Sequence, residues 1–263
     1  MFEIVFYILI GGAAGILAGL LGISGGVITV PALFFLFRYL NLPQGYLMHY
    51  AIGTSMAAMI FNSLSATYSH HKRSSVLWPV IKKMLLGIVL GSVVGAVIAD
   101  HLSGTILEIF FGAFALLIGI YFFKPSTLHE GDHRLPSFFP LNAISFGVSF
   151  LANILGIGGG IITVPILMAF KMSDRKAIGS SSAITLCITT LGALLYLYFG
   201  EGVVTFHSSI GFIYLPAFFV IAVTTFFSAP YGVKLAHQLP SSIIRKIFAC
   251  ALILTGLVMI FSK

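Results

Sequence analysis

Apolar runs long enough to cross a lipid bilayer follow one another along almost the whole chain, and this feature limits the folds open to it. The run from Ile106 to Phe123, for example, contains a single charged residue. Crossing the hydrocarbon core takes about 20 such residues in a helix. Only 8% of the chain is charged, whereas a soluble domain is about one-quarter charged. We therefore predict an all-α integral membrane protein, because a transmembrane barrel would need short segments of alternating polarity.

The apolar runs divide into ten predicted segments separated by short polar breaks. The longest polar stretch, Lys124 to Ser137, carries a proline, histidines and charges of both signs near the middle of the chain. We predict a first transmembrane repeat over 1–123, a linker over 124–137 and a second transmembrane repeat over 138–263. The expected segments are 3–21, 26–38, 47–69, 78–99, 105–123, 138–155, 160–170, 177–199, 209–233 and 242–261.

Three short motifs occur in both halves in the same order. The decapeptide GISGGVITVP at 22–31 recurs as GIGGGIITVP at 156–165. AIGTS at 51–55 corresponds to AIGSS at 177–181, and GAVIA at 95–99 corresponds to GVKLA at 232–236. An internal duplication is the simplest explanation. Because each half holds five segments, an odd number, the second half is predicted to lie in the membrane with the opposite orientation.

The distribution of Lys and Arg predicts which face is cytoplasmic. These residues concentrate in short cytoplasmic loops, and alternating crossings place all 14 on one face except Arg38 and Lys263. We expect a multi-pass protein of the cell (inner) membrane, with the linker in the cytoplasm and both termini outside. The expectation holds whether the first two segments of each half cross fully or form a re-entrant, glycine-tipped hairpin. The sequence leaves both arrangements open.

Glycine-rich breaks at 22–26 and 156–160 interrupt apolar segments at matching places. Irregular backbone is tolerated at membrane depth only against protein or a water-filled cavity. In transporters with inverted repeats, such breaks mark the substrate site. A helix N-terminus after each break would offer N–H groups and a positive dipole end to an anion. A tight turn that serves packing is the alternative.

Ser and Thr clusters in the third segment of each half could supply hydroxyl donors to the same anion. They could equally bond to a neighbouring helix or to the carbonyl four residues earlier. Asn62 and Asn153 have the same two interpretations, and packing is favoured for both. The predicted substrate-binding residues are Ser24, Gly25, Gly26, Thr29, Gly53, Thr54, Ser55, Gly158, Gly159, Gly160, Thr163, Gly179, Ser180 and Ser181.

Small residues that repeat every fourth position predict two faces where helices pack closely. The first face comprises Gly11, Gly15 and Gly19. The second comprises Gly87, Gly91 and Gly95, whose counterparts in the other half are Thr224, Ser228 and Gly232. Close approach of the two backbones explains this spacing without any binding role.

Other function classes find little support in the sequence. Residues 22–26 fit the G-x-S-x-G pattern of a serine nucleophile, but that motif needs a preceding strand, and Ser24 becomes Gly158 in the second copy. The run from His129 to His133 contains metal-binding residue types within a short polar stretch. We predict no enzymatic activity, no cofactor and no metal. The net charge of +7 fits a basic cytoplasmic rim, so no nucleic acid partner is expected.

The glycine-rich decapeptide, its second copy and the AIGTS and AIGSS elements together resemble the TauE/SafE sulfite-exporter family over nearly the whole chain. The resemblance implies transport of sulfur-containing anions such as sulfite, thiosulfate, sulfoacetate and sulfonates. The residues alone would also allow a carboxylate, a phosphate or a neutral solute. We therefore expect a secondary transporter that works by alternating access at a midplane site. An anion channel and a transporter of another small organic anion are the alternatives.

The expected partners are a small sulfur-containing anion and membrane lipid, and a homo-oligomer is compatible with the sequence. Asp, Glu or Lys inside the membrane would by default indicate ion coupling. The apolar segments show no buried carboxylate relay. The sequence therefore leaves the coupling ion and the direction of transport open.

Overall fold

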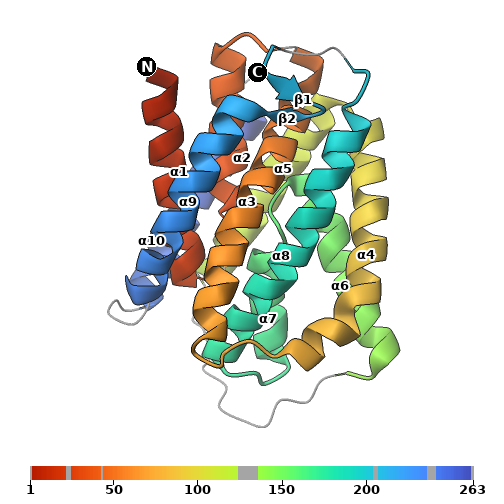
Figure 1. The fold of residues 1–263 in the computed structure, drawn as a ribbon, viewed down its shortest axis with the longest axis vertical. Coiled ribbons are helices and arrows are strands. Elements are labelled where there is room, and N and C mark those ends of the chain that lie inside the picture. Colours follow the sequence, from red (N-terminus) through yellow and green to blue (C-terminus); the bar gives the residue numbers. More distant parts are fainter. Residues whose placement is uncertain are drawn as a thin grey trace.

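The computed structural model describes residues 2–21, 25–42, 44–123, 136–203, 207–235 and 241–261. Because lipid offers no hydrogen bonds, backbone groups inside a bilayer must be paired within the protein, and this favours helices. The described residues accordingly form ten α-helices, one short 3-10 helix and two very short strands (Figure 1). In chain order they are α1 (Phe2–Leu21), α2 (Gly26–Tyr39), η1 (Gln44–Tyr46), α3 (Leu47–His71), α4 (Trp78–His101), α5 (Gly104–Phe122), α6 (Phe138–Leu155), α7 (Gly160–Ala169), α8 (Asp174–Phe199), β1 (Ser209–Ile210), β2 (Ile213–Tyr214), α9 (Leu215–Leu235) and α10 (Ser241–Phe261).

The outer surface of the bundle is apolar. Among the described residues, six helices are long and apolar enough to cross a membrane: α1, α4, α5, α6, α8 and α9. Large apolar side chains such as Leu117 and Phe139 point outward, with exposed fractions of 68% and 83%. Most residues of α3, by contrast, are buried. The chain is therefore an all-α integral membrane protein, as predicted.

Helices α2 and α7 are too short to cross a bilayer. They contain 14 and 10 residues, which gives lengths of about 21 and 15 Å against a hydrocarbon core of about 30 Å. In Figure 1, α1 and α2 both reach the end of the bundle that carries the chain termini, whereas α6 and α7 both reach the opposite end. Each pair therefore forms a hairpin that returns to the end it came from. This geometry favours the re-entrant arrangement.

The predicted close-packing faces are confirmed. A Cβ placed on Gly15 would collide with Ser228 and Thr225 of α9, and a Cβ placed on Gly91 would collide with Phe146 of α6. The glycines therefore let α1 approach α9, and α4 approach α6, at backbone distance. These two pairs form some of the most extensive helix contacts in the protein.

Contacts between helices follow a pattern expected for two related halves. α1 packs on α9 as α6 packs on α4, and the third helices of the two halves, α3 and α8, pack on each other. Ser63 Oγ and Thr189 Oγ1, at matching positions of α3 and α8, lie 3.5 Å apart. This pattern supports the predicted duplication. The orientation of each half relative to the two sides of the membrane stays a prediction.

The segment expected over 209–233 begins differently from the prediction. Residues 209–214 form a two-stranded antiparallel hairpin, and α9 starts only at Leu215. Gly211 occupies the turn with φ of +53°, a conformation that favours glycine. The apolar residues continue through the hairpin into α9 without a break. Hydropathy alone therefore placed the helix boundary too early, since a short apolar run does not distinguish a strand from a helix.

Candidate functional site

The two glycine-rich breaks form the tips of the two hairpins, and each tip ends in the N-cap of a short helix. Gly25 precedes α2, and its carbonyl accepts hydrogen bonds from the backbone N–H and the hydroxyl of Thr29, both at 3.0 Å. Gly159 precedes α7, and its carbonyl accepts the equivalent bonds from Thr163, both at 2.9 Å. The two N-cap glycines are buried. Both tips thus present a helix N-terminus to the protein interior.

The tips touch each other between α3 and α8. A Cβ on Gly26 would lie 2.5 Å from the carbonyl oxygen of Gly156. Ser55 of α3 donates a hydrogen bond to the same oxygen at 3.3 Å, and Ser181 of α8 donates to the carbonyl of Gly160 at 3.5 Å. The predicted residues found at the tips are Gly25, Gly26, Thr29, Ser55, Gly158, Gly159, Gly160, Thr163 and Ser181. Ser24 lies outside the described residues.

Four predicted residues face other parts of the protein: Gly53, Thr54, Gly179 and Ser180. Thr54 Oγ1 accepts the backbone N–H of Tyr214 at 2.9 Å, and Ser180 Oγ accepts the backbone N–H of Leu77 at 3.0 Å. Each glycine, one position earlier, lies against the same chain segment, where an added Cβ would be 2.5 Å from a backbone oxygen. The two hydroxyls therefore satisfy the backbone just before α9 and α4. This is the interhelical role that the sequence left open for them.

Charged side chains do not contribute to the interior around the tips. Among the residues whose burial the structure describes, no Asp, Glu, Lys or Arg is buried. Positive potential at the tips must come from the backbone, because the first N–H groups of α2 and α7 lack acceptors within their helices. No group of three or more His, Cys, Asp or Glu in the described part of the chain could hold a metal. The linker run at 129–133 lies outside that part.

The two asparagines singled out in the sequence are buried and incompletely bonded. Asn153, near the end of α6, donates from its amide to the carbonyl of Ser149 at 2.9 Å, and its backbone carbonyl accepts the hydroxyl of Tyr196 at 2.9 Å. The side-chain oxygens of Asn153 and Asn62 have no hydrogen-bond partner among the described residues. Buried polar atoms are normally paired. Packing alone, the role favoured from the sequence, does not account for these two oxygens.

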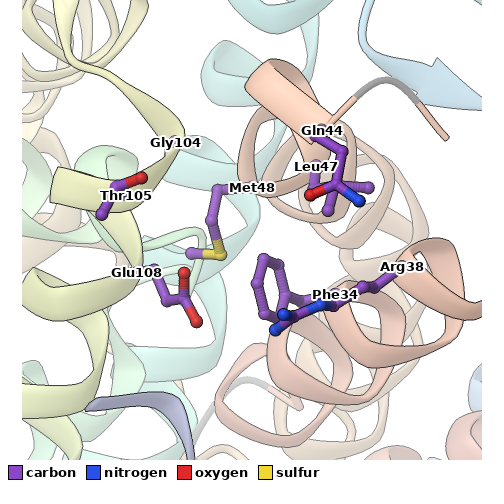
Figure 2. A pocket seen from close by; sticks show the side chains of 8 residues that line it. All are labelled: Phe34, Arg38, Gln44, Leu47, Met48, Gly104, Thr105 and Glu108. Carbon is purple, nitrogen blue, oxygen red and sulfur yellow. The ribbon is translucent and has the colours of Figure 1, made fainter. Parts of the chain in front are cut away.

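A pocket of about 260 Å³ (Figure 2) is lined by elements that meet near the end of the bundle carrying the chain termini in Figure 1. Its walls come from the last turns of α2, from η1 with the start of α3, and from the first turns of α5. The lining residues are Phe34, Arg38, Gln44, Leu47, Met48, Gly104, Thr105 and Glu108. The sequence did not predict this pocket, because its charged residues are far apart along the chain. Arg38 was the one residue of the pocket that the sequence could have singled out, because the predicted topology places it on the membrane face opposite almost all other basic residues.

An all-α bundle with an apolar outer surface, in which two broken hairpins meet, is the architecture of a class of polytopic membrane transporters. The family model described as sulfite exporter TauE/SafE matches residues 7–259. The chain therefore belongs to the TauE/SafE sulfite exporter family.

Several curated relatives cover nearly the full chain. A probable membrane transporter protein of Haemophilus influenzae is 31% identical, with 97% of each chain aligned. A probable membrane transporter protein of Methanocaldococcus jannaschii is 27% identical, with 96% of this chain and 94% of the relative aligned. The protein YunE of Bacillus subtilis, also named a probable membrane transporter protein, is 26% identical, with 98% of each chain aligned. No solved structure shows a significant match. The chain is thus a membrane transporter, and these relatives' names specify no substrate.

Proposed function

We propose that the chain is a secondary transporter of small sulfur-containing anions, of the sulfite, thiosulfate, sulfoacetate or sulfonate type. The substrate binds at the hairpin tips, and transport proceeds by alternating access. The observation that carries this proposal is the contact of Gly26 with the carbonyl of Gly156, which places the N-terminus of α2 against the tip of the second hairpin, three residues before the N-cap of α7. The family description, sulfite exporter, supports the sulfur-anion class.

Two helix N-termini can hold an anion without a buried basic residue. Each N-terminus carries about half a positive charge and presents unpaired N–H donors. An oxyanion matches these donors, since it offers several acceptor oxygens on a small volume. A site without Lys or Arg also binds less tightly. Moderate affinity suits a transporter, because the substrate must leave the site on the opposite side of the membrane.

The tips are closed against each other in the present conformation. Gly26 and Gly156 are in contact, and the hydroxyls of Thr29 and Thr163 donate to the N-cap carbonyls. An anion can reach the N–H groups of α2 and α7 only when the hairpins move apart. Separation of the tips, first toward one side and then toward the other, is therefore the movement that alternating access requires.

We further place the protein in the cell (inner) membrane, with the two repeats joined by a cytoplasmic linker and both termini outside. Apart from Arg38, the Lys and Arg residues in the described chain lie at the end of the bundle opposite the termini. Such asymmetry supports a cytoplasmic location for that end. Lipid and a small anion are sufficient partners for this role, and no enzymatic step is part of the proposal.

A thermal-shift screen tests the substrate class. A ligand that binds the folded state raises its stability, so purified protein is heated with sulfite, thiosulfate, sulfoacetate, taurine or sulfate. We expect a concentration-dependent rise in Tm with at least one of these. Stabilisation by carboxylates alone would reassign the substrate to another organic anion. Failure of every anion to shift Tm or to cross proteoliposome membranes would contradict the proposal.

An anion channel is the second candidate, because closed hairpin tips also resemble a gate. The two functions differ in their flux. A carrier saturates at low substrate concentration and is stimulated by substrate on the opposite side, whereas an open pore shows single-channel conductance in planar bilayers. Conductance steps with sulfite as the main anion would favour the channel.

A further inference from the structure

The pocket at the terminus end of the bundle contains both a positive and a negative side chain. Figure 2 shows Arg38 reaching into it from α2 across Phe34, and Glu108 entering from α5 on the opposite wall. Gln44 lines the pocket from a third element, η1. Both charged side chains are partly buried, so their charges are less screened than those of fully exposed groups.

Arg38 is electrostatically distinctive at this end. It is the only Lys or Arg described there, whereas the carboxylates of Glu3, Asp100 and Glu201 belong to helix ends or loops on the same side. Among the described residues at this end, Arg38 therefore offers an approaching anion its basic side chain, with Glu108 on the facing wall of the pocket. The planar guanidinium binds oxyanions through two parallel N–H bonds. The N-terminus of α5, at Gly104 in the pocket wall, adds a positive dipole end.

We propose that this pocket is a recruiting site for a small sulfur oxyanion, in which Arg38 binds the anion and Glu108 limits its affinity. The proposal rests on the proposed transport function. The pocket volume suits a small solute, since drug-sized ligands occupy pockets of about 300–1,000 Å³. Glu108 faces the same volume, so its negative charge opposes the anion and keeps binding weak enough for onward release.

Helix α2 connects this pocket to the proposed central site. Gly26 begins the helix at the hairpin tips, and Arg38 lies in its last turn. Twelve residues of helix separate them by about 18 Å. A movement of α2 that opens the tips therefore also moves Arg38 relative to Glu108. Binding in the pocket and opening of the tips are thus linked through one continuous helix, which contains Pro31 between the two sites.

Arg38 could also serve only to stabilise the C-terminus of α2, where a cation is favourable. The isosteric substitution Glu108→Gln separates the two roles, because it removes the opposing charge and leaves Arg38 in place. Arg175→Gln, on the exposed surface of α8 at the other end of the bundle, removes the same charge as Arg38→Gln and serves as the matched control.

The test measures binding of sulfite to the purified proteins by calorimetry, and uptake of radiolabelled sulfite into vesicles of both orientations. Arg38→Gln should raise Kd, and the KM from the terminus side, at least about tenfold, because it removes the charge-assisted hydrogen bonds of the guanidinium. Glu108→Gln should lower both about two- to fivefold, and Arg175→Gln should change neither.

An unchanged or raised Kd in Glu108→Gln would overturn the recruiting site. It would also be overturned if Arg38→Gln raised the KM for uptake equally from both sides of the membrane. In either case saturable sulfite transport by the unaltered protein would leave the proposed function intact. If the unaltered protein neither bound nor transported sulfite, thiosulfate or sulfoacetate, the proposed function would fail, and the recruiting site with it.

Discussion

The glycines at the hairpin tips meet two different physical demands. Gly26 provides space, because any Cβ there would press on the carbonyl of Gly156. Gly159 provides a conformation, because its φ of +82° lies in the left-handed region. Space and conformation can be tested separately, since the chain contains glycines that meet only one of these demands or neither.

Gly159→Ala and Gly202→Ala form a matched pair of substitutions. Gly202 has nearly the same φ, +83°, but a Cβ there would meet no atom within 4 Å. Both changes should cost about 1–2 kcal/mol of folding free energy from backbone strain, and Gly159→Ala also requires Ile188 to shift, because the added Cβ would lie 2.9 Å from its Cδ1. Only Gly159→Ala should also lower the initial rate of anion uptake, by at least about tenfold, because it alters the helix N-terminus proposed to bind the anion. Equal uptake by the two variants, after correction for protein amount, would remove Gly159 from the site.

Gly26→Val tests the space between the tips, and Gly12→Val in α1 is its control. A Cβ on Gly12 would meet nothing within 4 Å, whereas one on Gly26 would meet Gly156 and Met59. We expect Gly26→Val to lower Tm and abolish uptake, and Gly12→Val to insert and transport normally. Normal uptake by Gly26→Val would show that the tips do not need to close together during the cycle.

At the level of elements, the third helix of each half uses one hydroxyl to accept a hydrogen bond from the backbone of the other half. Thr54 holds the backbone just before α9, and Ser180 holds the backbone just before α4. Thr54→Val keeps the side-chain shape and removes the hydroxyl that accepts the backbone N–H of Tyr214, which should cost about 1–3 kcal/mol. Thr190→Val, whose hydroxyl bonds within its own helix to Leu186, should cost much less. Denaturant unfolding of the two variants measures the difference, and equal stability would contradict the assigned role.

The sequence predicted these elements well where hydropathy and repetition decide the structure. The duplicated decapeptide located both tips, and the glycine stripes located the closely packed faces of α1 and α4, whose partners α9 and α6 only the structure identifies. The hairpin at 209–214 was missed, because its residues are as apolar as those of α9. The partners of Thr54 and Ser180 were also beyond prediction, since a hydroxyl near a helix start has several acceptors and donors within reach. Only the tertiary fold selects among them.

At the scale of the whole molecule, the arrangement of basic residues makes the orientation testable. Single cysteines at positions 45 and 72, in a variant without Cys187 and Cys250, would lie at opposite ends of the bundle, and both positions are exposed. A membrane-impermeant maleimide on intact cells should label Gly45→Cys and spare Lys72→Cys. After lysis both should react. The reverse labelling would place the linker outside and contradict the proposed topology.

The central claim is that this protein carries a small sulfur-containing anion through a site that is exposed to one side at a time. Counterflow in proteoliposomes tests it most directly: vesicles are loaded with unlabelled sulfite, diluted, and given a trace of radiolabelled sulfite outside. The account predicts transient accumulation of label above its equilibrium level, abolished in Gly159→Ala and absent from protein-free vesicles. Label that enters without overshoot would contradict alternating access, and label that does not enter for sulfite, thiosulfate or sulfoacetate would contradict the substrate class.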